Sequence, residues 1–133
     1  MSGITLDGKL YMMEQDRVFK GEDVVRFLKH LMRQIPGKLL IIWDGSPIHR
    51  GGALKDFLAS GAASQVQQEQ LPGYAPDLNP DEGVCKHLKC VELKNLCCEN
   101  LAELRVELGK AKERLRHKRD VILGCIRQLG FEV

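Results

Sequence analysis

The sequence predicts a mixed α/β fold in which short strands come first and helices gather toward the carboxyl end. Asp7-Gly8 lies between two apolar, β-favouring runs, which predicts an antiparallel hairpin over residues 3–13. The continuous apolar run Leu39–Trp43 is typical of a strand buried on both faces. Apolar residues recur at helical spacing over 22–35 and 101–115, so each segment is expected to form an amphipathic helix.

Shorter signals predict the remaining elements. Apolar spacing indicates a short helix over 53–60. Residues 66–71 are polar, and their place between a helix and a loop favours a strand at the sheet edge. Three prolines predict an ordered loop over 72–80, where Asn79 is the expected N-cap of the next helix. A last helix is expected over 120–129, which gives the order β-β-α-β-α-β followed by helices.

Length and composition bound the class of protein. The 133 residues suffice for one domain, with the sheet and its crossover helices in 1–71, the loop in 72–80 and helices in 81–133. An apolar share of 44% with 29% charged residues argues against a disordered chain. No apolar run approaches the roughly 20 residues of a membrane span, and the start does not resemble a secretory signal. We therefore expect a cytoplasmic protein that has no membrane partner and no disulfide framework.

Two carboxylates, those of Asp44 and Glu82, are the candidate functional groups. Asp44 follows the buried strand at the edge where α/β sheets hold ligands, although its side chain also suits the start of an Asp-Gly-Ser-Pro turn. Glu82 falls in the first turn of the predicted helix, where it also suits a capping box with Asn79. Acids in these two places can hold hard divalent cations, and paired cations activate water in many nucleases.

Two segments resemble a known family: 41–50, which reads IIWDGSPIHR, and 71–84, which reads LPGYAPDLNPDEGV. They are similar to the catalytic core of bacterial insertion-sequence transposases of the mariner superfamily. The resemblance implies an RNase H-like fold, a DDE endonuclease whose Asp, Asp and Asp/Glu triad binds two Mg²⁺ or Mn²⁺ ions, and DNA strand cleavage and strand transfer. It places Asp44 as the second acid and Glu82 as the third, both as catalytic residues and metal ligands.

The chain departs from this family at two points. No residue matches the first catalytic Asp, which lies on a strand upstream of the hairpin, and Cys85 stands where the family's helix usually carries Trp. The fold class implied is a truncated RNase H-like fold without its central first strand. Backbone groups beside that gap would be left unpaired. We therefore expect a fragment that is inactive alone and forms a homo-oligomer through the exposed sheet edges, or rearranges its sheet.

Alternative interpretations remain open at this stage. The chain can be a non-catalytic remnant that self-associates or binds a partner transposase, with its acids serving only the turn and the cap. His49 lies near the site by resemblance, or only stabilises the turn. Cys85, His87 and Cys90 form a weak zinc pattern. Basic residues over 105–119 can meet DNA phosphates, but interleaved glutamates fit an ordinary solvated helix better.

Overall fold

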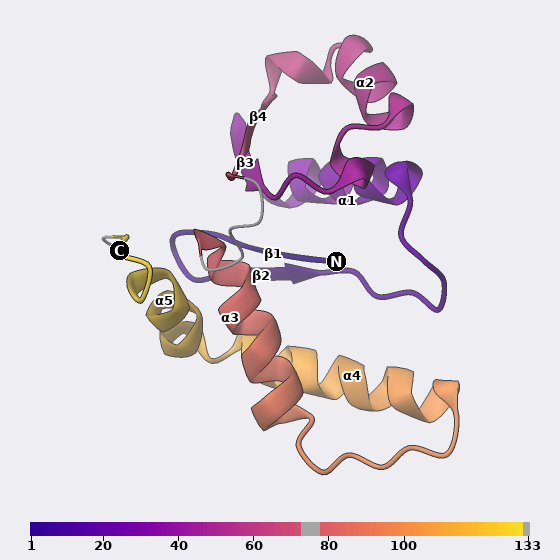
Figure 1. The fold of residues 1–133 in the computed structure, drawn as a ribbon, viewed down its shortest axis with the longest axis vertical. Coiled ribbons are helices and arrows are strands. Elements are labelled where there is room, and N and C mark those ends of the chain that lie inside the picture. Colours follow the sequence, from indigo (N-terminus) through magenta and orange to yellow (C-terminus); the bar gives the residue numbers. More distant parts are fainter. Residues whose placement is uncertain (73–77, 132–133) are drawn as a thin grey trace. The chain divides into compact units, whose positions relative to one another are not determined.

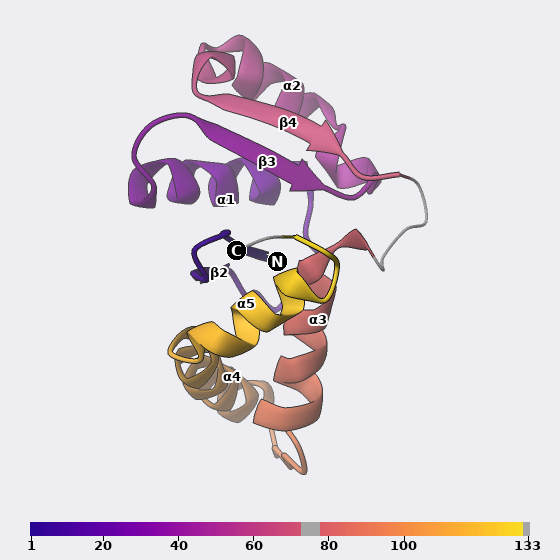
Figure 2. The same ribbon diagram turned by 90° about the vertical axis from the view of Figure 1, so that its left-hand side faces the viewer.

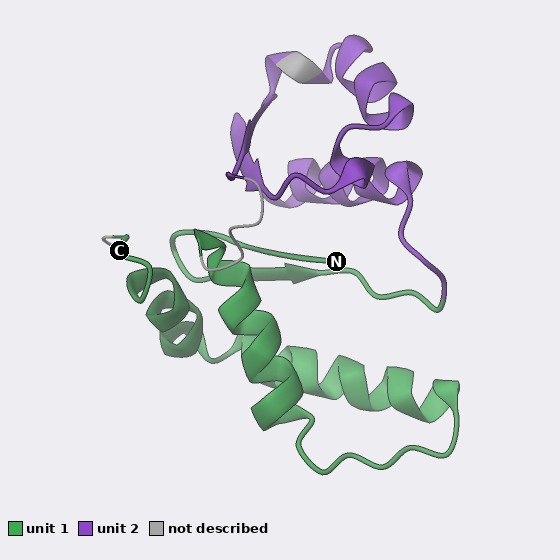
Figure 3. Cartoon of the chain, in the orientation of Figure 1, with its two compact units in different colours: residues 1–16, 77–133 green, residues 17–76 purple. Residues whose placement is uncertain are grey.

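The computed structural model describes residues 1–72 and 78–131; short strands and helices make up its amino-terminal part, and the elements described after β4 are helical (Figure 1). The elements are β1 (Ser2–Ile4), β2 (Leu10–Met12), α1 (Gly21–Gln34), β3 (Leu39–Trp43), η1 (Pro47–His49), α2 (Gly52–Ala59), η2 (Ala62–Ser64), β4 (Val66–Gln70), α3 (Pro80–His87), the π-helical turn η4 (Leu88–Glu92), α4 (Leu101–Arg116) and α5 (Arg119–Arg127). The chain divides into two compact units, called unit 1 (residues 1–16 and 77–133) and unit 2 (residues 17–76) (Figure 3).

Unit 2 is built on a parallel pair of strands. β3 and β4 run in the same direction (Figure 2), with Leu39 opposite Val66 and Trp43 opposite Gln70. Leu39 and Val66 are buried, whereas Leu40 and Ile42 on the other face of β3 are each more than half exposed. Helices α1 and α2 complete the unit and bury their own apolar residues, which are Val24, Phe27, Leu28, Leu31 and Leu54. The parallel pairing brings the carboxyl ends of both strands to one edge.

Unit 1 combines a hairpin with three helices. β1 and β2 pair antiparallel, with Ser2 opposite Met12 and Ile4 opposite Leu10. Its hydrophobic core joins β2, α3, η4, α4 and α5 through the buried residues Leu10, Val84, Leu88, Ala111, Leu115 and Ile122. The hairpin is thus held to the helices by burial of apolar side chains rather than by further strand pairing.

The predicted elements are present with small shifts at their ends. The helix expected over 22–35 is Gly21–Gln34, and the strand expected at 66–71 is Val66–Gln70. The predicted loop at 72–80 falls mostly on residues 73–77, which lie outside the described residues. None of the helices in the described ranges is long and apolar enough to cross a membrane.

The hairpin turn yields a prediction about stability. Gly8 has a φ of +85°, and a Cβ added there would lie 2.7 Å from Arg119 Cγ and 3.2 Å from Leu123 Cγ. Gly8→Ala should therefore lower the free energy of unfolding by about 2 to 3 kcal/mol, from the left-handed backbone and from overpacking together. Urea denaturation measures this loss.

Gly37 is the matched control for that substitution. Its φ of +86° is almost the same, but no described atom would lie within 4 Å of an added Cβ. Gly37→Ala should cost only the backbone term, about 1 kcal/mol. Equal losses at the two positions would show that packing of Arg119 against the turn does not constrain Gly8.

Candidate functional site

Asp44 begins the turn that follows β3. Its Oδ1 atom accepts a hydrogen bond from the backbone N–H of Ser46 at 3.0 Å. This contact confirms the predicted turn role of the aspartate. The side chain is 56% exposed, and its Oδ2 atom has no partner among the described residues. One carboxylate oxygen therefore holds the turn and the other stays available.

His49 lies against the same carboxylate. Its Nδ1 atom is 3.1 Å from Asp44 Oδ1 and 3.1 Å from the Asp44 backbone oxygen. The imidazole also stacks on the Trp43 indole, with ring centroids 4.3 Å apart and planes 6° from parallel. Trp43, Asp44 and His49 thus form one compact group at the carboxyl end of β3, all within unit 2.

Glu82 occupies the first turn of α3. The side chain of Asn79 caps this helix, as predicted, by accepting from the Asp81 N–H at 3.1 Å. The Glu82 carboxylate is exposed and makes no hydrogen bond or ion pair with the described residues. The reciprocal bond of a capping box is therefore absent here, so the capping alternative does not account for this carboxylate.

Asp81, beside it, points into unit 1 instead. Ser2 Oγ donates to Asp81 Oδ2 at 2.6 Å and lies 3.4 Å from Cys85 Sγ. The other oxygen, Asp81 Oδ1, is buried without a hydrogen-bond partner among the described residues. Burial raises the pKa of Asp81 and also that of the Cys85 thiol. Sequence reasoning missed this contact, because Ser2 and Asp81 are distant in the chain and Ser2 lies in no motif.

The two candidate ligands belong to different units. Asp44 is in unit 2 and Glu82 is in unit 1, so the structure defines the surroundings of each carboxylate separately. Across residues 1–72 and 78–131, no group of three His, Cys, Asp or Glu side chains is arranged to hold a metal ion. The zinc pattern of Cys85, His87 and Cys90 is therefore not assembled, and His87 Nε2 instead pairs with Glu92 Oε1 at 3.2 Å.

The basic residues of α4 and the segment after it are engaged with acceptors. Their partners are carboxylates, in the pairs Arg105–Asp16, Lys110–Glu107, Lys112–Glu14, Arg114–Glu92, Arg116–Glu113 and Lys118–Glu92. Arg119 Nε donates to the backbone oxygen of Asp7 at 2.7 Å. These pairings favour the structural interpretation of the basic residues over a phosphate-binding one.

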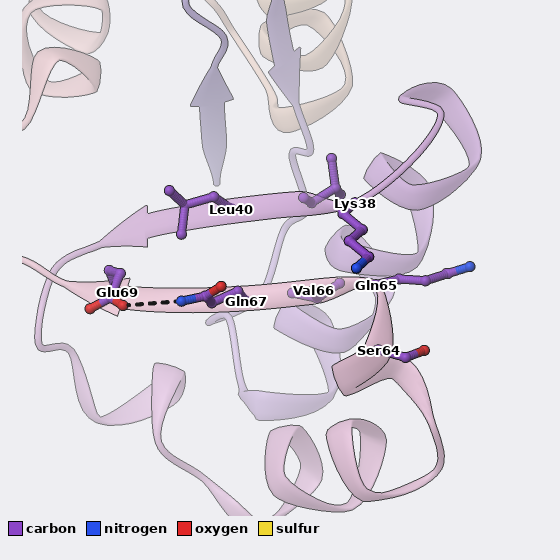
Figure 4. Close-up of a pocket in the computed structure, with 8 residues that line it drawn as sticks. Lys38, Leu40, Ser64, Gln65, Val66, Gln67 and Glu69 are labelled. Carbon is purple, nitrogen blue, oxygen red and sulfur yellow. Dashed lines mark hydrogen bonds between the residues drawn. The ribbon is translucent and has the colours of Figure 1, made fainter.

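A groove of about 370 Å³ lies over the parallel strands of unit 2 (Figure 4). Its lining comes from β3, β4 and the residues just before them: Lys38, Leu39, Leu40, Ser64, Gln65, Val66, Gln67 and Glu69. Within it, Gln67 Nε2 lies 3.5 Å from Glu69 Oε1. Asp44 does not line this groove, so it is separate from the candidate ligand at the end of β3.

The mixed α/β fold of the chain is similar to the RNase H-like fold of the Mos1 mariner transposase catalytic domain. The chain is similar to the crystal structure of the Mos1 mariner paired-end complex with Mn, with a TM-score of 0.68 and 15% identity over 95% of this chain and 38% of that one. It is also similar to the catalytic domain of Mos1 mariner transposase, with a TM-score of 0.54 and 16% identity over 96% of this chain and 72% of that one. The predicted fold class is confirmed. The chain spans about two fifths of the Mos1 chains in the paired-end complexes.

A family match at the level of sequence agrees with the fold. The family model described as DDE superfamily endonuclease matches residues 1–105, so the chain belongs to this family. No curated protein sequence is significantly similar to the chain. The predicted DDE transposase resemblance is thereby confirmed, while its bacterial origin stays a prediction.

Proposed function

We propose that the chain is part of the catalytic domain of a DNA transposase, in which Asp44 and Glu82 are two of the ligands for Mg²⁺ or Mn²⁺. The observation that carries this proposal is a free carboxylate oxygen at each candidate position. Asp44 Oδ2 and the Glu82 carboxylate lack partners among the described residues, in a chain of the DDE superfamily endonuclease family. Free, exposed carboxylate oxygens suit these hard cations.

Each side chain has a distinct part in this proposal. Cations held by these residues would supply activation of the attacking water or 3′-hydroxyl and stabilisation of the leaving oxygen. Asp44 offers Oδ2 from a turn that its own Oδ1 holds in place. Glu82 offers its carboxylate from the first turn of α3. The family's first Asp has no counterpart here, so we propose that the chain is inactive alone and that a complete site needs an acid from outside it.

DNA and a second copy of the chain are the proposed partners. Two of the similar Mos1 structures are paired-end complexes, one of them with the left transposon end, which supports transposon ends as the DNA bound. β3 pairs only with β4 among the described strands, and Leu40 and Ile42 are 58% and 57% exposed. An open strand edge with apolar side chains suits pairing with a strand from a second copy.

The alternative is a non-catalytic remnant that self-associates or binds a partner transposase. The observation that favours it is the lack of any three-ligand group in the described parts of the chain. In this interpretation Asp44 serves only the turn to Ser46. Cation binding separates the two functions, because the remnant needs no metal.

A Mn²⁺ titration by calorimetry, with light scattering on the same sample, tests the proposal. We expect the wild-type chain to bind Mn²⁺, and Asp44→Ala and Glu82→Ala each to weaken binding at least tenfold while circular dichroism stays unchanged. Asp56→Ala is the matched control, because Asp56 is also an exposed aspartate of unit 2 and should leave the affinity unaltered. A folded chain that binds no Mn²⁺ would support the remnant instead.

A further inference from the structure

We propose that His49 is a positioning residue for Asp44: it fixes Oδ1 of the carboxylate, so that Oδ2 alone faces a bound cation. This inference rests on the proposed function, because it concerns the same ligand. Three contacts within unit 2 support it: the hydrogen bond of His49 Nδ1 with the Asp44 backbone oxygen, the 3.1 Å contact of Nδ1 with Oδ1, and the stack of the ring on Trp43.

The direction of the hydrogen bond follows from its acceptors. His49 Nδ1 faces two oxygens of Asp44, the backbone carbonyl and carboxylate Oδ1, each at 3.1 Å. An ionised carboxylate and a carbonyl only accept hydrogen bonds, so Nδ1 must carry the proton and donate. The ring N–H thus hydrogen-bonds to the Asp44 backbone oxygen and lies within 3.1 Å of Oδ1, which accepts the backbone N–H of Ser46. Oδ2 is the carboxylate oxygen that has no partner among the described residues.

The imidazole is itself held in place on two sides. Its stack on Trp43 anchors the ring to the last residue of β3. The backbone N–H of His49 donates to the Ser46 backbone oxygen at 3.0 Å, a hydrogen bond that closes the η1 turn. The His49 side chain is only 15% exposed, so few other ring orientations are open to it. A fixed ring gives the carboxylate a fixed plane, which a freely rotating aspartate at an exposed turn would lack.

Two substitutions separate the hydrogen bond from the stack. His49→Phe keeps a ring against Trp43 but removes the donor, and loss of an outer-shell partner of a metal ligand typically weakens metal binding by about 10- to 100-fold. His49→Asn keeps an N–H donor near the Nδ1 position but removes the ring, so we expect Mn²⁺ affinity within about threefold of wild type.

Fluorescence provides a readout independent of metal. Trp43 is the only tryptophan in the chain, so its emission reports on the stack. His49→Asn should change that emission, while His49→Phe should leave Trp43 packed against a ring. Weaker Mn²⁺ binding in His49→Phe but not in His49→Asn supports the positioning role. Unchanged affinity in His49→Phe, or equal losses in both variants, would overturn it.

Failure of the proposed function is detected separately. If the wild-type chain binds no Mn²⁺, the ligand role of Asp44 fails, and nitrogen NMR of the His49 ring then tests the positioning contact by itself. The Nδ1 resonance should shift in Asp44→Asn and stay unchanged in Asp56→Asn. An Nδ1 resonance that does not respond to Asp44→Asn would show that the carboxylate and the ring are not coupled.

Discussion

Leu115→Ala should lower the free energy of unfolding by about 3 kcal/mol, the loss expected when a fully buried leucine leaves a cavity behind it. Leu115 is 0% exposed and lies in the core of unit 1 with Val84, Leu88 and Ile122. These neighbours come from α3, η4 and α5, so the cavity would be lined by three elements that cannot all move inward. Urea denaturation followed by circular dichroism measures the loss.

Leu101→Ala is the control on the same helix. Leu101 is 58% exposed at the start of α4, so its removal should change the free energy of unfolding by less than about 0.5 kcal/mol. Because both residues are leucines in α4, helix propensity contributes equally to the two variants. Similar losses at both positions would contradict the placement of the core around the carboxyl half of α4.

The bounds of elements with a strong hydrophobic pattern were predictable from sequence almost to the residue. The bounds of β3 are those predicted from the apolar run Leu39–Trp43, but the prediction that both its faces are buried was wrong, since Leu40 and Ile42 are more than half exposed. A continuous apolar run does not indicate which of its faces stays uncovered. The polar segment Val66–Gln70 was predicted only from its position, and four of its five residues are exposed. What makes it a strand is pairing with β3, which composition does not encode. The π-helical turn Leu88–Glu92 had no sequence signal either, since it continues the periodicity of α3.

The candidate site was predictable where the contacts are local. The turn role of Asp44 follows from the Asp-Gly-Ser-Pro sequence, and it is present in the structure. The stack of His49 on Trp43 depends on the geometry of η1, which brings the ring back over the strand. The capping box of Glu82 was one of two local alternatives, and in the structure the Asn79 side chain accepts from Asp81 N–H without a return bond from Glu82. The ligand roles of Asp44 and Glu82 stay predictions.

The second large effect on stability is expected at Glu92, whose carboxylate is buried in unit 1. Glu92 accepts from Arg114 Nε at 3.0 Å, from His87 Nε2 at 3.2 Å and from Lys118 Nζ. Its side chain is only 3% exposed, and its partners tie η4 to α4 and to the segment before α5. Glu92→Gln should lower the free energy of unfolding by about 2 kcal/mol, because hydrogen bonds to a charged group are lost at a buried position.

A more exposed ion pair, in α4, is the control for Glu92. Glu107 lies 3.3 Å from Lys110 Nζ at the surface of α4. Glu107→Gln should change the free energy of unfolding by less than about 0.5 kcal/mol, since exposed ion pairs contribute little. Equal losses of unfolding free energy in Glu92→Gln and Glu107→Gln would show that the contacts of Glu92 with Arg114, His87 and Lys118 stabilise no more than a surface ion pair.

The same cluster predicts how stability depends on pH. The Lys118 hydrogen bond, with those from Arg114 and His87, lowers the pKa of Glu92 from its ordinary value of 4.5 to about 2. A folded-state pKa below the unfolded one means that the stabilisation is fully present above about pH 4.5 and is lost as the pH falls toward 2. The difference in unfolding free energy between wild type and Glu92→Gln should therefore be constant from pH 5 to 7 and shrink steadily below pH 4.5. Urea denaturation at pH 7, 4 and 3 checks this, and a difference that stays constant down to pH 3 would contradict the lowered pKa.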